Sequence, residues 1–159
     1  MIKVKDIMTT DLITLTPDME IATAGNILLE NRINGAPVLD ENGGLVGILC
    51  QSDLIAQQKK LPIPTVFTLL DSVIQLTSKK QIEKQVRKIT ALTVSQAMTP
   101  NPVTVKPDSM LETVAGLMVE SNFHTLPVIE NGRLVGIIGK EDILRNLLSP
   151  HSEHQKKQV

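Results

Sequence analysis

Residues 45–54 read Leu-Val-Gly-Ile-Leu-Cys-Gln-Ser-Asp-Leu, and residues 134–143 repeat the pattern as Leu-Val-Gly-Ile-Ile-Gly-Lys-Glu-Asp-Ile. In both stretches an apolar run containing one glycine ends at polar residues that include an aspartate, and an apolar helical pattern follows. This order predicts a buried strand that leads directly into a helix. A glycine within a strand allows close approach of another backbone or of a ligand. The chain is therefore interpreted as one unit written twice.

The aspartates of these stretches, Asp53 and Asp142, are expected in the first turn of the two helices. There, free amide groups and the positive end of the helix dipole favour negative charge. Such a corner can bind a ligand through amides on one side and a carboxylate on the other. A second interpretation stays open, in which Ser52 is an N-cap and the two aspartates only complement the helix dipole.

The composition restricts the class of protein. A chain of 159 residues, 42% of them hydrophobic, can bury a core as one domain or as two small packed halves. The net charge of −1 and the absence of tryptophan and tyrosine argue against binding of nucleic acid. The single cysteine, Cys50, excludes an intramolecular disulfide and fits a reducing compartment. No apolar run has the length of a membrane helix, so we expect a cytoplasmic protein without membrane insertion.

The similarity extends well beyond the two quoted stretches. Each copy predicts strand, helix, strand, strand and helix: 12–15, 19–31, 36–39, 45–49 and a closing helix in the first, 103–105, 111–121, 126–129, 134–138 and a closing helix in the second. Between the last two strands of each copy an Asn-Gly pair predicts a hairpin. Equivalent residues lie at an offset of 90, which becomes 89 after the hairpin: Met8 and Met98, Thr14 and Thr104, Pro17 and Pro107, Pro37 and Pro127, Gly47 and Gly136, Asp53 and Asp142. Halves of about fifty residues are expected to pack together as a pseudo-symmetric pair.

The repeats set the predicted domain boundaries. Residues 1–61 form the first repeat, 62–90 a helical insert, 91–148 the second repeat and 149–159 a flexible tail. The insert has an apolar helical face. That face either folds back on its own domain or meets another chain, and both alternatives stay open.

At these residues the chain resembles a tandem pair of cystathionine β-synthase (CBS) domains, a Bateman module. The resemblance rests on the Asp-Ile-Met-Thr opening, the threonine before Pro-Asp, the apolar-Pro-Val strand, and Leu-Val-Gly-Ile with an aspartate six residues after the glycine. It implies an α+β fold of two pseudo-symmetric CBS domains (β-α-β-β-α each) packed through their sheets, with the helical insert between them. It also implies a homodimer that requires no cofactor, binds adenine nucleotides (AMP, ADP or ATP, with S-adenosylmethionine less expected) and signals by conformational change to a regulated protein in trans.

The resemblance also assigns residues to two composite clefts. The first cleft is expected to contain Asp53, Ser52, Cys50 and Ile48 with Thr93, Ala97, Met98, Phe123 and His124. The second is expected to contain Asp142, Lys140, Gly139 and Ile137 with Val4, Ile7, Met8, Ile33 and Asn34. For His124 a phosphate-facing role and a partly exposed place at the end of a helix both stay open, and the two methionines are expected mainly as core fillers.

Both copies depart from the family pattern. Cys50 and Gly139 stand where the family commonly has threonine or serine, and Glu141 precedes Asp142. A thiol is a weak donor, so Ser52 and the helix N-terminus would have to bind most of a phosphate. Glu141 would repel a phosphate unless Lys140 offset its charge. The first cleft is therefore predicted to be the better nucleotide site.

Three other functions are considered. Catalysis is not expected, because two of the three histidines lie in the tail and no nucleophile with a positioned base is evident. A metal site built from Cys50, His124 and a carboxylate lacks paired-ligand spacing. The remaining alternative is a nucleotide-independent dimerisation or protein-interaction module with degenerate clefts, in which the insert docks a partner.

Overall fold

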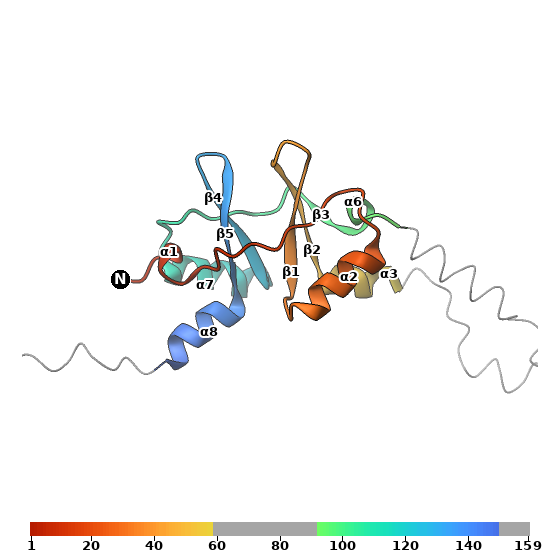
Figure 1. Cartoon of the computed structure of the whole chain (residues 1–159). Helices are drawn as coiled ribbons and strands as arrows, with labels where there is room; N and C mark the ends of the chain where they lie inside the picture. The colour runs from red at the N-terminus through yellow and green to blue at the C-terminus, as the bar shows by residue number, and fades with distance from the viewer. Residues whose placement is uncertain (59–91, 150–159) are drawn as a thin grey trace, which may run out of the picture. The chain divides into compact units, whose positions relative to one another are not determined.

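The structure is a computed structural model that describes residues 1–58 and 92–149, and it divides into two compact units (Figure 1). Unit 1 comprises Met1–Leu12 and Val103–Val159, and unit 2 comprises Ile13–Pro102. Each repeat therefore contributes its leading segment to the unit that is built mainly from the other repeat. The leading segment of the first repeat is residues 1–12, and that of the second repeat is residues 92–102. We call these two the exchanged segments. The predicted helical insert at 62–90 lies outside the described residues, as does the predicted tail from residue 150 onward.

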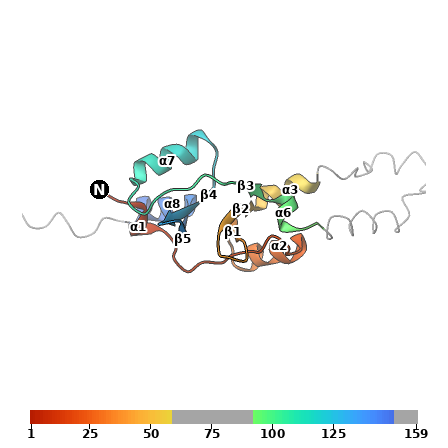
Figure 2. The ribbon, with the colours of Figure 1, turned by 90° about the horizontal axis from the view of Figure 1, so that it is seen from above.

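Unit 2 is a three-stranded antiparallel sheet with helices, in the strand order β1-β2-β3. β3 enters from the second repeat and pairs with the middle of β2, with Gly47 opposite Pro100 and Ile48 opposite Thr99. The preceding helix, α6, contacts both α2 and α3 (Figure 2). The elements of unit 2 are α2 (Ile21–Glu30), β1 (Gly35–Leu39), β2 (Leu45–Cys50), α3 (Gln51–Gln58), α6 (Val94–Ala97) and β3 (Thr99–Pro100).

Unit 1 repeats this plan. β4 and β5 form an antiparallel pair, and Thr9 from the leading segment bridges to Ile137 of β5 in the same antiparallel sense. α1 contacts α8. The elements are α1 (Val4–Ile7), α7 (Leu111–Glu120), β4 (Thr125–Glu130), β5 (Arg133–Gly139) and α8 (Lys140–Leu148). No helix within residues 1–58 and 92–149 is both long enough and apolar enough to cross a membrane.

The leading segments are bound through the free amides of their short helices. In unit 1 the backbone N–H groups of Val4 and Lys5 donate to the carbonyl oxygens of Ser109 and Pro107, at 3.0 and 2.9 Å. In unit 2 the amides at 94 and 95 bind the carbonyl oxygens at 19 and 17 in the same way, at 2.8 and 2.9 Å. The first amides of a helix have no partner within the helix. The Pro-Asp turn before each long helix supplies that partner.

The strands predicted at 12–15 and 103–105 are reduced to one bridging residue each. Leu15 donates to the carbonyl of Pro37 at 2.9 Å and accepts from the amide of Leu39 at 3.0 Å, as a single parallel bridge to β1. Extending the pairing in either direction would require an N–H donor at Pro17 or at Pro37, and proline has none. Val105 pairs with β4 in the same way, and the equivalent positions 107 and 127 are also prolines.

Both predicted hairpins are present, with different turns. In the second, Asn131 and Gly132 connect the paired residues Glu130 and Arg133 and have φ angles of 51° and 76°. Two central residues with positive φ are the signature of the tight turn that matches the twist of a hairpin. The first hairpin is longer, and Asp40 closes it by accepting hydrogen bonds from the amides of residues 42 and 44, at 2.9 and 2.8 Å.

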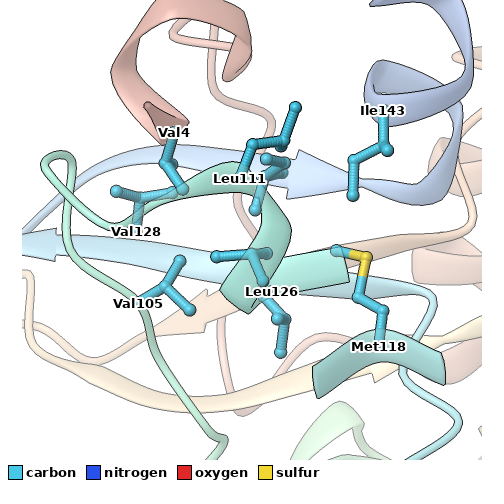
Figure 3. Packing of buried hydrophobic residues seen from close by; sticks show 9 residues of the cluster. Val4, Val105, Leu111, Met118, Leu126, Val128 and Ile143 are labelled. Carbon is cyan, nitrogen blue, oxygen red and sulfur yellow. The ribbon is translucent and has the colours of Figure 1, made fainter. Parts of the chain in front are cut away.

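Each unit has its own apolar core, and both cores include residues of the exchanged segments. Val4 is fully buried in the core of unit 1 (Figure 3), and Val94 is fully buried in that of unit 2. The cores account for the helical periodicity of the sequence, since α2 and α7 bury the predicted apolar stripe. The core of unit 1 consists of Val4, Val105, Leu111, Val114, Met118, Leu126, Val128, Ile138 and Ile143.

Candidate functional site

Asp53 lies at the corner where β2 passes into α3. Its Oδ2 atom accepts a hydrogen bond of 2.8 Å from the backbone N–H of Cys50, the last residue of β2. Its Oδ1 atom has a more distant partner, the hydroxyl of Thr99 on β3, at 3.5 Å. A distance of 3.5 Å lies at the outer limit of a hydrogen bond. One carboxylate oxygen is therefore bound firmly within the corner, and the other is bound loosely.

Asp142 occupies the equivalent corner between β5 and α8. Its Oδ2 atom accepts a hydrogen bond of 2.8 Å from the N–H of Gly139, and its Oδ1 atom lies 3.5 Å from the hydroxyl of Thr9. The two corners thus share donors, acceptors and distances although their intervening residues differ. The two repeats of the sequence therefore form two aspartate corners with the same hydrogen-bond geometry.

The N-terminus of α3 shows whether Ser52 is an N-cap. The helix begins at Gln51, so Ser52 is its second residue, and the side chain is exposed. The prediction that Ser52 is the N-cap is therefore wrong. Cys50 holds that position, and its N–H is bound by the Asp53 side chain. Both aspartates do lie in the first turn, as both interpretations require.

The glycines of the two strands make room for the exchanged segments. A Cβ atom on Gly47 would overlap the Met98 sulfur and lie 3.0 Å from the carbonyl oxygen of Thr99. On Gly136 it would lie 2.6 Å from the Met8 sulfur and 3.1 Å from the carbonyl oxygen of residue 9. The close approach predicted at these glycines is therefore made by the backbones of Thr99 and Thr9. Both methionines pack against the core of their unit, as expected of core fillers.

Burial is the main influence on the pKa values of Asp53 and Cys50 in the first corner. It raises the pKa of the Asp53 carboxyl above its ordinary value, opposed by the hydrogen bonds from the Cys50 N–H and the Thr99 hydroxyl. Burial also raises the pKa of the Cys50 thiol to about 11, and the nearby Asp53 carboxylate adds to the effect. The charged form of each group is disfavoured by the loss of water. The thiol is therefore neutral at pH 7 and is not an activated nucleophile.

Cys50 should be alkylated slowly by iodoacetamide at pH 8. The thiolate is the reactive species, and a pKa of about 11 leaves roughly a hundredth or less of the thiolate fraction of an ordinary cysteine at that pH. We expect the rate to rise continuously between pH 8 and pH 10 in the folded protein. Mass spectrometry would follow the reaction, with protein unfolded in guanidinium as the control. A rate that reaches its plateau by pH 9 would contradict the assignment.

The residues predicted around Asp53 largely belong to unit 2. Ile48 and Ala97 are almost fully buried, with 6% and 8% of their surface exposed, so they contribute mainly packing. Thr93 is half-buried, and its hydroxyl is hydrogen-bonded to that of Ser95 at 3.1 Å. The predicted residues of the first cleft in unit 2 are Ile48, Cys50, Ser52, Asp53, Thr93, Ala97 and Met98.

The residues predicted around Asp142 largely belong to unit 1. The Val4 side chain is fully buried in the core, and its N–H and carbonyl are hydrogen-bonded to Ser109 and Met8, so Val4 contributes mainly packing. Lys140 is half-buried, and the exposed Glu141 is paired with Arg145 at 3.5 Å rather than turned toward Lys140. The predicted residues of the second cleft in unit 1 are Val4, Ile7, Met8, Ile137, Gly139, Lys140 and Asp142.

Four predicted residues lie in the other unit from their assigned aspartate. Phe123 and His124 belong to unit 1, and Ile33 and Asn34 belong to unit 2. Their participation in composite clefts stays a prediction. Within their own units, the carbonyl oxygens of His124 and Asn34 accept the first amides of α8 and α3, at 3.0 and 2.8 Å. His124 is exposed. Among residues 1–58 and 92–149, no three or more His, Cys, Asp or Glu side chains are grouped so that they could hold a metal ion.

Two residues of the corners, Thr9 and Thr99, were missed by the sequence reasoning. Each donates to the loosely bound oxygen of an aspartate in its own unit. A signal was present, because both threonines follow a repeated methionine at the offset of 90 shared by the other matches. The pattern did not reveal their role, since sequence spacing does not show which repeat a segment packs against.

Comparison with known proteins identifies relatives along nearly the whole chain. A model of the CBS domain matches twice, at residues 4–60 and 94–149. The uncharacterized protein MJ1426 of Methanocaldococcus jannaschii is 28% identical over 91% of this chain and 90% of its own length. The CBS domain-containing protein CBSX2, chloroplastic, of Arabidopsis thaliana is 31% identical over 87% of this chain, and the match spans 59% of that relative.

Solved structures share the fold. The crystal structure of CBSX2 in complex with AMP is 29% identical in sequence, with a TM-score of 0.68, and the match covers 92% of this chain and 96% of that one. The CBS domain pair of protein MJ0100, in complex with 5′-methylthioadenosine and S-adenosyl-L-methionine, is 28% identical with a TM-score of 0.69, over 92% and 95% of the two chains. The chain therefore belongs to the CBS domain family and contains two CBS domains in tandem.

Proposed function

We propose that this protein is a ligand-sensing module that binds adenine nucleotides at its aspartate corners and signals to a separate protein. The observation that carries the proposal is the geometry of the carboxylates. In each corner one oxygen accepts a backbone amide at 2.8 Å, and the other has only a hydroxyl at 3.5 Å. The ligands of the two solved relatives all contain adenosine or a 5′-thio derivative of it, which supports an adenosine-containing ligand here.

The chemistry of a ribose suits such a carboxylate. A ribose presents two neighbouring hydroxyl groups, and the loosely bound oxygen can accept a hydrogen bond from one of them. Hydrogen bonds to an ionised acceptor are about twice as strong as those between neutral groups. The first turn of the adjoining helix offers amides and a positive dipole end to a phosphate. A nucleotide bound in this way would contact the strand end and the helix start together.

We propose that the two corners differ in affinity. The exposed hydroxyl of Ser52 precedes Asp53, whereas the exposed carboxylate of Glu141 precedes Asp142. A phosphate near Asp142 would meet that negative charge, although Arg145 and Lys140 reduce it. AMP, ADP and ATP are the favoured ligands, and S-adenosylmethionine, which has no phosphate, is less favoured. The first corner is therefore the proposed main nucleotide site.

Signalling would follow from a shift between two arrangements of the protein. A ligand can move such an equilibrium only by as much as its affinities for the two arrangements differ. We propose that no catalysis is involved, that a regulated protein in trans reads the change, and that the protein is cytoplasmic, as its lone thiol suggests.

A homodimer is part of the same proposal. α8 exposes Leu144, Leu147 and Leu148, with 53, 68 and 79% of their surface accessible. Exposed apolar side chains grouped on one helix are typical of an interaction surface. The exposed leucines also support the second candidate function, a nucleotide-independent interaction module. A separate observation favours that function too, since Cys50 and Gly139 offer no hydroxyl to a phosphate.

AMP should raise the melting temperature of the protein. A ligand at a hundred times its dissociation constant stabilises the folded state by about 2.7 kcal/mol, which corresponds to roughly 5–10 °C for a protein of this size. Differential scanning calorimetry with AMP, ATP and S-adenosylmethionine would measure the shift, and inorganic phosphate would control for binding of a simple anion. The absence of a shift with all three compounds would leave the interaction module as the better account.

A further inference from the structure

The structure ties each site aspartate to a segment that comes from the other repeat. Thr99 belongs to the second repeat but pairs with Ile48 of β2, and its hydroxyl reaches Oδ1 of Asp53. Thr9 belongs to the first repeat but pairs with Ile137 of β5, through hydrogen bonds of 2.9 and 3.0 Å, and its hydroxyl reaches Oδ1 of Asp142. The threonine–aspartate contact thus occurs in both units, although the residues that precede the two aspartates differ.

The backbone pairing fixes where each hydroxyl lies. Thr99 is held opposite Ile48, and this register exists because Gly47 allows the segment to approach β2. Cys50 fixes the other oxygen of the same carboxylate. Two donors, one on each oxygen, restrict the rotation of the carboxylate about its last side-chain bond. A carboxylate oxygen has two lone pairs, so Oδ1 can accept from Thr99 and from a ligand at the same time.

We propose that Thr99 and Thr9 are positioning residues, whose hydroxyls orient the Asp53 and Asp142 carboxylates for a ribose diol. This inference rests on the proposed function and adds to it. Each ligand site would be complete only when both repeats are present, because one repeat supplies the carboxylate and the other the group that orients it. Both segments lie shortly before the chain passes to the other unit, after Leu12 and after Pro102.

Substitutions at residue 99 separate positioning from a merely structural role. Valine has the shape of threonine and favours strands, so Thr99→Val should keep the pairing with Ile48 while removing the hydroxyl. Thr99→Ser keeps the hydroxyl. We expect Thr99→Val to weaken AMP binding roughly 3- to 10-fold, the usual effect of one modest hydrogen bond, and Thr99→Ser to restore most of the affinity. Isothermal titration calorimetry of the full chain would measure both.

A second measurement needs no ligand. The Thr99 hydroxyl lowers the pKa of Asp53, so its removal should raise that pKa, and serine should reverse the change. The elements packed around Asp53 carry few other groups that could interfere: α2 contains Glu30, β2 contains the Cys50 thiol, and β1, β3, α3 and α6 contain no other charged side chain. Carbon-13 NMR of the side-chain carboxyls would follow the titration. Thr9→Val, which alters the equivalent contact in unit 1, should leave the titration of Asp53 unchanged.

The outcomes distinguish the two proposals. If the unsubstituted protein binds no nucleotide, the proposed function fails, and the NMR titration still decides whether Thr99 acts on Asp53. If AMP binds with equal affinity to the Thr99→Val variant, the positioning role is overturned while the proposed function stands. An unchanged Asp53 titration in Thr99→Val, or an equal shift in Thr9→Val, would also overturn it.

Discussion

Replacing Gly47 by alanine should destabilise the protein by about 1–3 kcal/mol, the usual effect of forcing an extra methyl group into a packed site. The new Cβ would overlap the Met98 sulfur and lie 3.0 Å from the carbonyl oxygen of Thr99. The side chain of Met98 can move, but the carbonyl belongs to the backbone of β3. Relief of the second contact therefore requires β3 to move away from β2. Thermal or urea unfolding would measure the loss.

The chain contains a matched control for this substitution. Gly116 lies within α7, and a Cβ there would meet no atom within 4 Å. Gly116→Ala should be neutral or should stabilise the protein by about 0.5–1 kcal/mol, because alanine favours a helix more than glycine does. Gly136→Ala should resemble Gly47→Ala, since its Cβ would lie 2.6 Å from the Met8 sulfur. A Gly47→Ala variant as stable as the unsubstituted protein would show that the exchanged segment does not pack closely on β2.

Asp53→Ala should have the largest effect on ligand binding and weaken AMP roughly 10- to 100-fold. This range corresponds to about 1.4–2.7 kcal/mol, the free energy lost with a hydrogen bond to a charged group. Asp142→Ala should have a smaller effect, because Glu141 makes the second corner less favourable to a phosphate. Isothermal titration calorimetry would give both affinities. Equal losses, or a larger loss for Asp142→Ala, would contradict the proposed order of the two corners.

The Asp53 carboxylate also binds the Cys50 amide, so its effects on stability and on affinity must be separated. Asp53→Asn keeps an oxygen that can accept from that amide at 2.8 Å and removes the charge. It should therefore preserve stability better than Asp53→Ala does, yet still weaken AMP. Affinity should also fall on acidification, since protonation removes the charge from the acceptor. Because the pKa of Asp53 is raised by burial, this loss should begin at a higher pH than for an exposed aspartate.

The sequence predicted the local elements well because their causes are local. The glycine-containing strand, the following helix with the aspartate in its first turn, and the two hairpins all follow from periodicity and turn residues. The strand predicted at 12–15 was too long because its pairing is limited by Pro37, a residue of the partner strand. The N-cap at Ser52 was wrong by two residues, because the strand continues directly into the helix without a turn.

The exchange of leading segments could not be predicted from the pattern. Val4 and Val94 carry the same apolar signal whichever repeat they pack against. The choice depends on contacts between residues far apart in the chain, such as Val4 with Ser109 and Val94 with Met19. For the same reason the repeated Met-Thr pairs were not connected with the aspartates. The prediction of composite clefts came from the resemblance to CBS domains alone, since neither composition nor spacing indicates them.

The most direct test of the carboxylate–ribose contact is calorimetric titration with AMP and with 2′,3′-dideoxy-AMP, which lacks both ribose hydroxyls. The unsubstituted protein should bind AMP at least about tenfold more tightly than the dideoxy compound, as expected when a charged acceptor loses its donors. In the Asp53→Ala variant this preference should largely disappear. Equal affinity of the unsubstituted protein for the two compounds, or a preference for AMP that survives in Asp53→Ala, would contradict the account.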